Sequence, residues 1–263
     1  MQHLFANDGG REIDWSRTSE DYAEHRPDYS AEFYDQLTER GVGLPGQRLL
    51  DLGTGVGFLA HNFARRGALV TGIDTAEGQI EVARRRAAAD GLKIDYRVAR
   101  AENTGLEDDD FEAVTASQCW LYFDQQQATA EVERLLRRKG LLAICHFCWL
   151  PREDAIARRS EALVLQFNPD WSGANWSGEV SEKMPSCFAG HFEQVELLVF
   201  DASIPFTHES WRGRWRACRG VGAALPPERV AKFDQEHAQL LARTVEEQFA
   251  VLHRIDCRIL RRL

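Results

Sequence analysis

Apolar runs and amphipathic stretches alternate along this chain. Strands are predicted where a short apolar run is bounded by turn residues, at 47–51, 68–74, 93–98, 111–117, 141–147, 192–201 and 250–260. Helices are predicted where apolar residues recur with helical spacing, at 19–25, 30–40, 58–66, 76–89, 125–139, 152–167, 179–189 and 226–248. Regular alternation of strand and helix is typical of an α/β fold with a parallel sheet.

The most informative stretch joins the first of these strands to the next helix. Residues 51–57 read Asp-Leu-Gly-Thr-Gly-Val-Gly, so an acid and three glycines occupy a strand-to-helix turn. Glycine lets the backbone approach a ligand closely, and a helix N-terminus attracts negative groups. A dinucleotide fingerprint would place its third glycine where this chain has Phe58, so the spacing argues against that class of cofactor.

A second acid, Asp74, ends the strand predicted at 68–74. It lies 74 − 53 = 21 residues beyond Gly53, close to the ~20 expected for a carboxylate that binds ribose hydroxyls. The acid at the end of the first strand, Asp51, would repel a phosphate but suits an amine. S-adenosylmethionine has a ribose and a cationic amino-acid end and no phosphate, so these residues favour it as the cofactor.

At these residues the sequence resembles the class I S-adenosylmethionine-dependent methyltransferases. It is most similar to the branch that includes the ubiquinone and menaquinone C-methyltransferases and many small-molecule methyltransferases. The resemblance covers about 14–147 well and the rest more loosely. It implies a doubly wound, mostly parallel, seven-stranded sheet, S-adenosylmethionine as cofactor and a small-molecule acceptor. It also implies an N-terminal lid, in which Tyr22 and Arg26 close over the cofactor and Arg26 pairs the methionine carboxylate.

The resemblance implies roles for individual cofactor-binding residues. Asp51 and the following glycines would meet the methionine end, and Asp74 would take the ribose hydroxyls. Relatives usually carry an acid before the alanine of the adenine loop, but this chain has Arg100 there, so adenine recognition falls to the backbone of Ala101 and to Glu102. The complete set predicted to bind the cofactor is Tyr22, Arg26, Asp51, Gly53, Thr54, Gly55, Asp74, Thr75, Ala101, Glu102, Ser117 and Gln118.

Aromatic residues follow the strand predicted at 111–117, at the sheet edge where open α/β folds bind ligands. Relatives commonly carry a histidine where this chain has Leu121, so a base is absent at that position. His146, at the end of the strand predicted at 141–147, is the candidate general base, with a structural histidine as the alternative. The predicted catalytic residues are His146 and Trp120. The predicted substrate-binding residues are Trp120, Phe123, Trp149, Trp171, Trp211 and Arg214.

The connection between the last two predicted strands is longer than a simple link between two strands requires, and we interpret it as a helical cap insertion. Its segment 209–219 is basic and aromatic, which suits an anionic or aromatic small substrate, a nucleic-acid patch or a solvated helix face. We therefore divide a single overall domain into a tail and lid at 1–40, a cofactor-binding core at 41–148, and the remaining sheet with cap insertions at 149–263.

The composition narrows the possible partners. The 263 residues carry a formal net charge of −9, which argues against a nucleic-acid partner, and no apolar run approaches the ~20 residues of a membrane span. The N-terminal residues lack the pattern of a signal peptide. The Cys145–Cys148 pair lacks the second pair that a zinc site needs, so no metal is expected and a reduced, cytoplasmic location is the default.

Other function classes and several properties stay open at this point. The alternatives are an NAD-dependent oxidoreductase, a non-catalytic cofactor-binding scaffold and, less favoured, an RNA methyltransferase. The sequence does not decide whether the acceptor atom is nitrogen, oxygen or carbon, nor the oligomeric state.

Overall fold

The computed structural model describes residues 7–8 and 11–263. Residues 1–6 and 9–10 of the predicted tail and lid at 1–40 therefore lie outside the described residues. By their contacts, residues divide into two compact units, each built from separate parts of the chain. Unit 1 comprises Met1–Pro27, Cys148–Val180 and Phe200–Ile255, and unit 2 comprises Asp28–Phe147, Ser181–Val199 and Asp256–Leu263.

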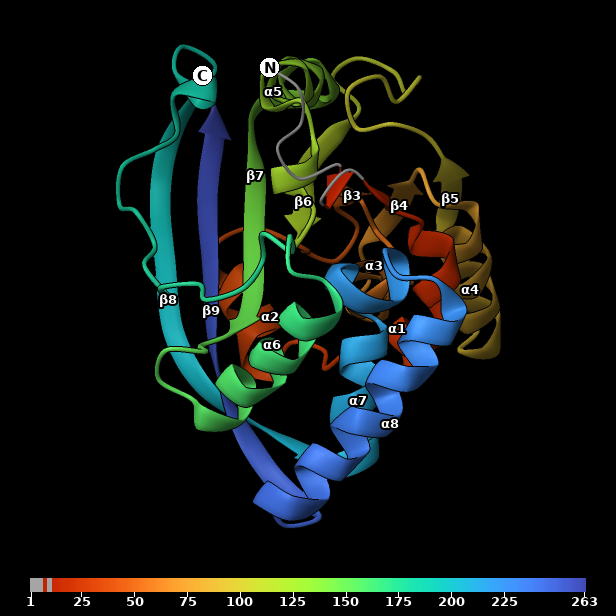
Figure 1. The fold of residues 1–263 in the computed structure, drawn as a ribbon. Helices are drawn as coiled ribbons and strands as arrows, with labels where there is room; N and C mark the ends of the chain where they lie inside the picture. Colours follow the sequence, from red (N-terminus) through yellow and green to blue (C-terminus); the bar gives the residue numbers. More distant parts are fainter. Residues whose placement is uncertain (1–6, 9–10) are drawn as a thin grey trace. The chain divides into compact units, whose positions relative to one another are not determined.

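Seven strands form one sheet in the order β5-β4-β3-β6-β7-β9-β8 (Figure 1). Their bounds are β3 Arg48–Leu52, β4 Leu69–Asp74, β5 Asp95–Val98, β6 Phe111–Ser117, β7 Leu136–Trp149, β8 Phe192–Thr207 and β9 Gln248–Arg262. The pairs β3–β4, β3–β6, β4–β5 and β6–β7 are all parallel. The predicted doubly wound, mostly parallel sheet is confirmed. A separate antiparallel pair is formed by β1 (Asn7–Asp8) and β2 (Arg11–Glu12).

Contacts between β7 and β9 show the direction of the last strand. The sulfur of Cys145 lies 3.4 Å from that of Cys257, and Nδ1 of His146 lies 3.0 Å from Oδ1 of Asp256. Residue numbers rise along β7 while those of the partners fall along β9, so the two strands are antiparallel. The strand predicted at 250–260 is therefore present, runs opposite to β7, and is longer than predicted.

Along the chain, the helices of unit 2 lie before, between and after the parallel strands. They are α2 (Ala31–Glu39), α3 (Phe58–Arg65), α4 (Glu77–Ala89), α5 (Gln125–Leu135) and the 3-10 turns η2 (Trp120–Tyr122) and η3 (Ser186–Phe188). The hydroxyl of Ser30 caps α2 by accepting from the backbone N–H of Phe33. The helix predicted at 125–139 stops at Leu135, because Leu136 already pairs with Phe111 of β6.

Unit 1 contains the remaining helices. They are η1 (Trp15–Thr18), α1 (Ser19–His25), α6 (Ala155–Phe167), α7 (His208–Arg216), the π-helical turn η4 (Arg219–Ala223) and α8 (Pro227–Thr244). Four tryptophans form the centre of its core: Trp149, Trp171, Trp211 and Trp215. Since α7 and α8 follow β8 and precede β9, the predicted helical insertion between the last two strands is present.

The prediction of a helix at 179–189 is wrong, because the only helical element in this segment is the short turn η3. Before this turn, backbone groups bond to side chains. The guanidinium of Arg258 donates to the carbonyl of Ser181 at 2.5 Å, and the hydroxyl of Ser181 accepts from the N–H of Lys183 at 3.2 Å. These bonds replace the i to i−4 pattern of a helix.

Within the part of the chain that the structure describes, none of the helices combines the length and the apolar character that a membrane span requires.

Candidate functional site

The glycine turn between β3 and α3 has a left-handed backbone conformation that residues other than glycine rarely adopt. Gly53, Gly55 and Gly57 have φ of 58°, 55° and 85°. A Cβ atom at Gly53 would lie 2.7 Å from Cβ of Cys119, and one at Gly57 would lie 2.3 Å from the hydroxyl of Tyr96. The turn therefore needs glycine at 53 and 57 for conformation and for space.

Asp51, the last acid before this turn, is 2% exposed. The hydroxyl of Thr54 donates to one of its oxygens at 2.6 Å, and the hydroxyl of Thr115 donates to the other at 2.7 Å. Burial raises the pKa of Asp51 to about 6, against the lowering effect of these two hydrogen bonds. A negative charge is thus held at the end of β3 at neutral pH, at a cost in desolvation.

Asp74 ends the neighbouring strand β4 and ties the turn to the next helix. Its two oxygens accept from the backbone N–H groups of Gly55 and Ala76, both at 2.9 Å. Burial raises the pKa of Asp74 above its ordinary value. The backbone of Thr75 also hydrogen-bonds to Asp74, and of the roughly four acceptor positions of a carboxylate about one then remains for a ligand. The predicted cofactor residue Thr75 lies between Asp74 and Ala76, the capping position of α4, where no side chain caps the helix.

The remaining predicted cofactor residues of unit 2 follow β5 and β6. Glu102 accepts from the backbone N–H of Asp124 at 2.9 Å, and Ala101 is buried. Ser117 ends β6, and its hydroxyl lies 2.8 Å from that of Tyr29. Gln118 follows with a φ of 63°. Tyr29, which the sequence analysis did not assign to the site, is thus a further polar group beside Ser117.

His146 and Asp256 form the second polar feature of unit 2. Nδ1 of His146 lies 3.0 Å from Oδ1 of Asp256, with side-chain exposures of 33% and 7%. The pairing of Ser117 with Cys145 places His146 one residue beyond the end of the β6–β7 ladder. That is the carboxyl edge of the sheet, at which β3 and the glycine turn also end. The sequence analysis identified His146 but missed Asp256, which lies 110 residues away.

The two aromatic candidates after β6 differ in their surroundings. Trp120 is 5% exposed and packs against Phe188, with ring centroids 5.4 Å apart. Phe123 is half-buried, and its Cζ would lie 3.4 Å from a Cβ at Gly53. Phe123 thus borders the glycine turn, whereas Trp120 belongs to the core of unit 2.

The other predicted residues belong to unit 1. Tyr22 and Arg26 lie at α1 and its C-terminal cap, with the guanidinium of Arg26 5.4 Å from the Tyr22 ring centroid. Trp149, Trp171 and Arg214 are 8%, 6% and 6% exposed. Trp211 has no exposed surface, so this structure gives it a packing role, contrary to the predicted substrate contact.

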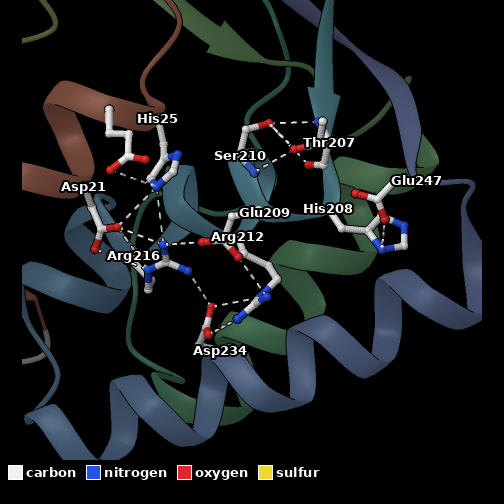
Figure 2. Close-up of polar contacts among 11 residues, drawn as sticks. Asp21, His25, Thr207, His208, Glu209, Ser210, Arg212, Arg216, Asp234 and Glu247 are labelled. Atoms are coloured by element: carbon white, nitrogen blue, oxygen red, sulfur yellow. Dashed lines mark hydrogen bonds and ion pairs between the residues drawn. The ribbon is translucent and has the colours of Figure 1, made fainter.

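The basic segment at 209–219 is not a cationic patch, because acids neutralise its outer arginines (Figure 2). Arg212 donates to Asp234 of α8 at 3.0 Å, and Arg216 donates to Asp234 and to Asp21 of α1, both at 2.9 Å. The hypothesis that this segment forms a nucleic-acid patch therefore loses its support. Arg214 is absent from this network.

Among the described residues, no three His, Cys, Asp or Glu side chains converge to hold a metal ion.

Comparisons with known proteins agree with this geometry. Residues 50–144 match the sequence profile of a methyltransferase domain. A ubiquinone biosynthesis O-methyltransferase of Xanthomonas campestris pv. campestris is 31% identical over 66% of this chain and 72% of the relative. One from Methylocella silvestris is 51% identical over 60% of this chain and 63% of the relative.

A solved structure from Anaeromyxobacter dehalogenans, assigned as a type II methyltransferase, has a TM-score of 0.60 and 22% identity. The match covers 89% of this chain and 97% of that structure. At this identity the likeness shows the fold.

Proposed function

Because the chain belongs to the class I S-adenosylmethionine-dependent methyltransferases, we propose that it methylates a hydroxyl group of a small organic acceptor. Two observations support oxygen as the accepting atom. The relatives named above are O-methyltransferases of ubiquinone biosynthesis. In this chain His146 lies 3.0 Å from a buried carboxylate, and this pair is the observation that carries the proposal.

The residues around the glycine turn fit the cofactor. The ribose hydroxyls and the ammonium group of S-adenosylmethionine are donors, and Asp51 and Asp74 are acceptors at the ends of adjacent strands. Neither 51–57 nor 74–76 contains a lysine or arginine that would balance a pyrophosphate. We assign Asp74 to the ribose, Asp51 and the turn to the methionine end, and the loop at 101–102 to the adenine.

The cofactor, when bound, supplies an electrophilic methyl group on a cationic sulfonium. The chain's task is to hold the acceptor in line with that methyl and to remove the hydroxyl proton. We assign the proton to Nε2 of His146. Nδ1 of His146 then carries a hydrogen and donates to Asp256, which selects this tautomer and stabilises the imidazolium that forms. Partial exposure of His146 leaves its ring open to an acceptor.

Two substitutions test this assignment. His146→Ala should lower kcat for a hydroxyl acceptor by about 10² to 10⁴, the usual contribution of a general base. Asp256→Asn should lower kcat less, because the base stays in place but loses the counter-charge that orients it. The affinity for S-adenosylhomocysteine should stay unchanged in both variants. The assay measures release of S-adenosylhomocysteine with purified protein and a pool of hydroxylated metabolites.

The chain provides a matched control for these variants. His191 forms a comparable pair with Glu133, 2.5 Å apart and with side-chain exposures of 38% and 33%. His191→Ala should leave kcat unchanged. An equal loss in both histidine variants, or a loss below about tenfold in His146→Ala, would refute the base assignment. Tight NADH binding without any S-adenosylhomocysteine release would refute the reaction class.

A further inference from the structure

Arg214 differs from the other two arginines of α7 in its electrostatic surroundings. Its side chain is 6% exposed, and its guanidinium carbon lies 4.8 Å from the ring centroid of Trp149. Arg212 and Arg216 each lie two positions from Arg214, so their side chains leave the helix about 200° away from that of Arg214. Both of them pair with acids (Figure 2). Among the residues that the structure describes, no carboxylate lies within ion-pair distance of Arg214.

The charged group that acts on Arg214 is a second cation, Arg26. Burial is the main reason that the pKa of Arg214 falls to about 10, and the charge of Arg26 lowers it further. Arg214 therefore still carries its charge at neutral pH. Buried charges in proteins are normally paired, because desolvation of a lone ion is costly. The arrangement in unit 1 thus provides a buried positive charge for which the described chain supplies no counter-ion.

The packing of α1 on α7 places these two arginines near each other. A Cβ atom at Gly213 would lie 1.9 Å from Cδ2 of His25, so only glycine at that position allows this approach. Arg26 follows His25 directly at the end of α1. Tyr22, Cys148 and Cys218 also interact electrostatically with Arg214. Besides Arg26, the groups that act on Arg214 thus include one aromatic ring, a phenol and two thiols.

We propose that Arg214 and Trp149, both in unit 1, form a binding site for the carboxylate group of a small organic acid. A guanidinium binds a carboxylate through two parallel hydrogen bonds, and one carboxylate balances the single charge of Arg214. Arg26 is already assigned, by family resemblance, to the carboxylate of the cofactor. The ring of Trp149 offers an apolar surface beside the anionic end of such a ligand, which suits an aromatic acid.

Binding of a simple carboxylate tests the site without requiring methyl transfer. Benzoate is the probe, and benzamide is its neutral counterpart of the same shape. Calorimetry on the full chain should show tighter binding of benzoate than of benzamide. Arg214→Met keeps an apolar side chain over Trp149 but removes the charge, and should weaken benzoate binding roughly ten- to a hundred-fold. Arg212→Met, on the same helix, should leave benzoate binding unchanged.

Two results with these ligands would overturn the carboxylate site. They are equal affinity for benzoate and benzamide in the wild type, and undiminished benzoate binding in Arg214→Met. If Arg214→Met does not fold, Arg214→Lys takes its place; it keeps the cation and should retain part of the preference for benzoate. A complete loss in a folded Arg214→Lys, matched by an equal loss for benzamide, would indicate a packing role and also overturn the proposal.

Two further measurements identify the source of the carboxylate. S-adenosylhomocysteine should bind Arg214→Met and wild type equally; a tenfold loss that is absent for a decarboxylated analogue would assign the site to the cofactor and overturn the proposal. Benzoate binding that depends on Arg214, without S-adenosylhomocysteine release from any hydroxy acid, would refute the proposed function and leave the carboxylate site standing.

Discussion

Replacing Asp51 by asparagine should stabilise the protein at neutral pH and weaken its binding of the cofactor. Asp51 is almost fully buried, and burial raises its pKa to about 6. The hydroxyls of Thr54 and Thr115 both donate to it. Asparagine fits the same space, because its oxygen can accept from one hydroxyl while its NH₂ group donates to the other after that hydroxyl rotates. The substitution removes a buried charge and keeps two hydrogen bonds.

The size of the effect follows from proton linkage. The folded state holds the Asp51 proton with a pKa of about 6, against 3.8 for the ordinary group. Between these pH values the folded chain is protonated at Asp51 and the unfolded chain is not, so stability falls as the pH rises. The pKa of Asp51 thus differs by about 2.2 between the folded and the unfolded chain, which corresponds to about 3 kcal/mol of destabilisation above pH 6. Asp51→Asn should recover a large part of it.

Urea denaturation at several pH values between 4 and 8 measures this effect. The free energy of unfolding of Asp51→Asn minus that of the wild type should be small near pH 4, rise towards pH 6 and stay constant above it. Asp35→Asn is the control, because Asp35 has a 66% exposed side chain and pairs with Arg66 at 3.3 Å. That exposed pair should change stability by less than about 1 kcal/mol.

Two results would contradict the reasoning. The first is an Asp51→Asn variant that is less stable than the wild type at pH 7. The second is a difference between the two proteins that does not vary from pH 4 to pH 7. The functional half of the prediction is measured separately, as a loss of S-adenosylhomocysteine affinity of roughly ten- to a hundred-fold by calorimetry.

Three further substitutions test other parts of the site. Asp74→Ala should weaken S-adenosylhomocysteine binding by roughly ten- to a hundred-fold but weaken an analogue without ribose hydroxyls much less; equal calorimetric losses would assign Asp74 to the turn alone. Arg26→Ala should weaken binding of S-adenosylmethionine and spare a decarboxylated analogue, whereas equal losses would indicate a structural role. Gly53→Ala should destabilise the protein more than Gly46→Ala in urea denaturation, where left-handed backbone alone costs about 1–2 kcal/mol. Both glycines have positive φ, but only at Gly53 would the new Cβ meet Cys119; equal costs would contradict this.

The fold was largely predictable because its signals are local. Each parallel strand is a short apolar run bounded by turn residues, and this pattern needs no knowledge of distant contacts. The prediction failed at 179–189, where no helix forms. There the backbone carbonyl of Ser181 bonds to Arg258, 77 residues away along the chain, and such a contact leaves no trace in local periodicity.

The candidate site divides in the same way. The glycine turn and Asp74 were identified from spacing, because both sit at strand ends that a parallel sheet brings to one edge. The contacts that define their chemistry lie far apart in sequence. Thr115 reaches Asp51 across 64 residues, and Asp256 reaches His146 across 110. The sequence identified the histidine as a candidate but offered no means of finding its carboxylate.

By itself, the sequence determined the α/β alternation, the glycine turn with its two acids, and the resemblance that names the cofactor. These depend on residue types at short separations, which the chain order already specifies. The tertiary structure alone decided which arginines of α7 are paired with acids. Arg212, Arg214 and Arg216 look alike in sequence, but helix geometry turns Arg212 and Arg216 towards acids and buries Arg214 against Trp149. Charge is read from a sequence residue by residue, whereas its neutralisation depends on which helices pack together.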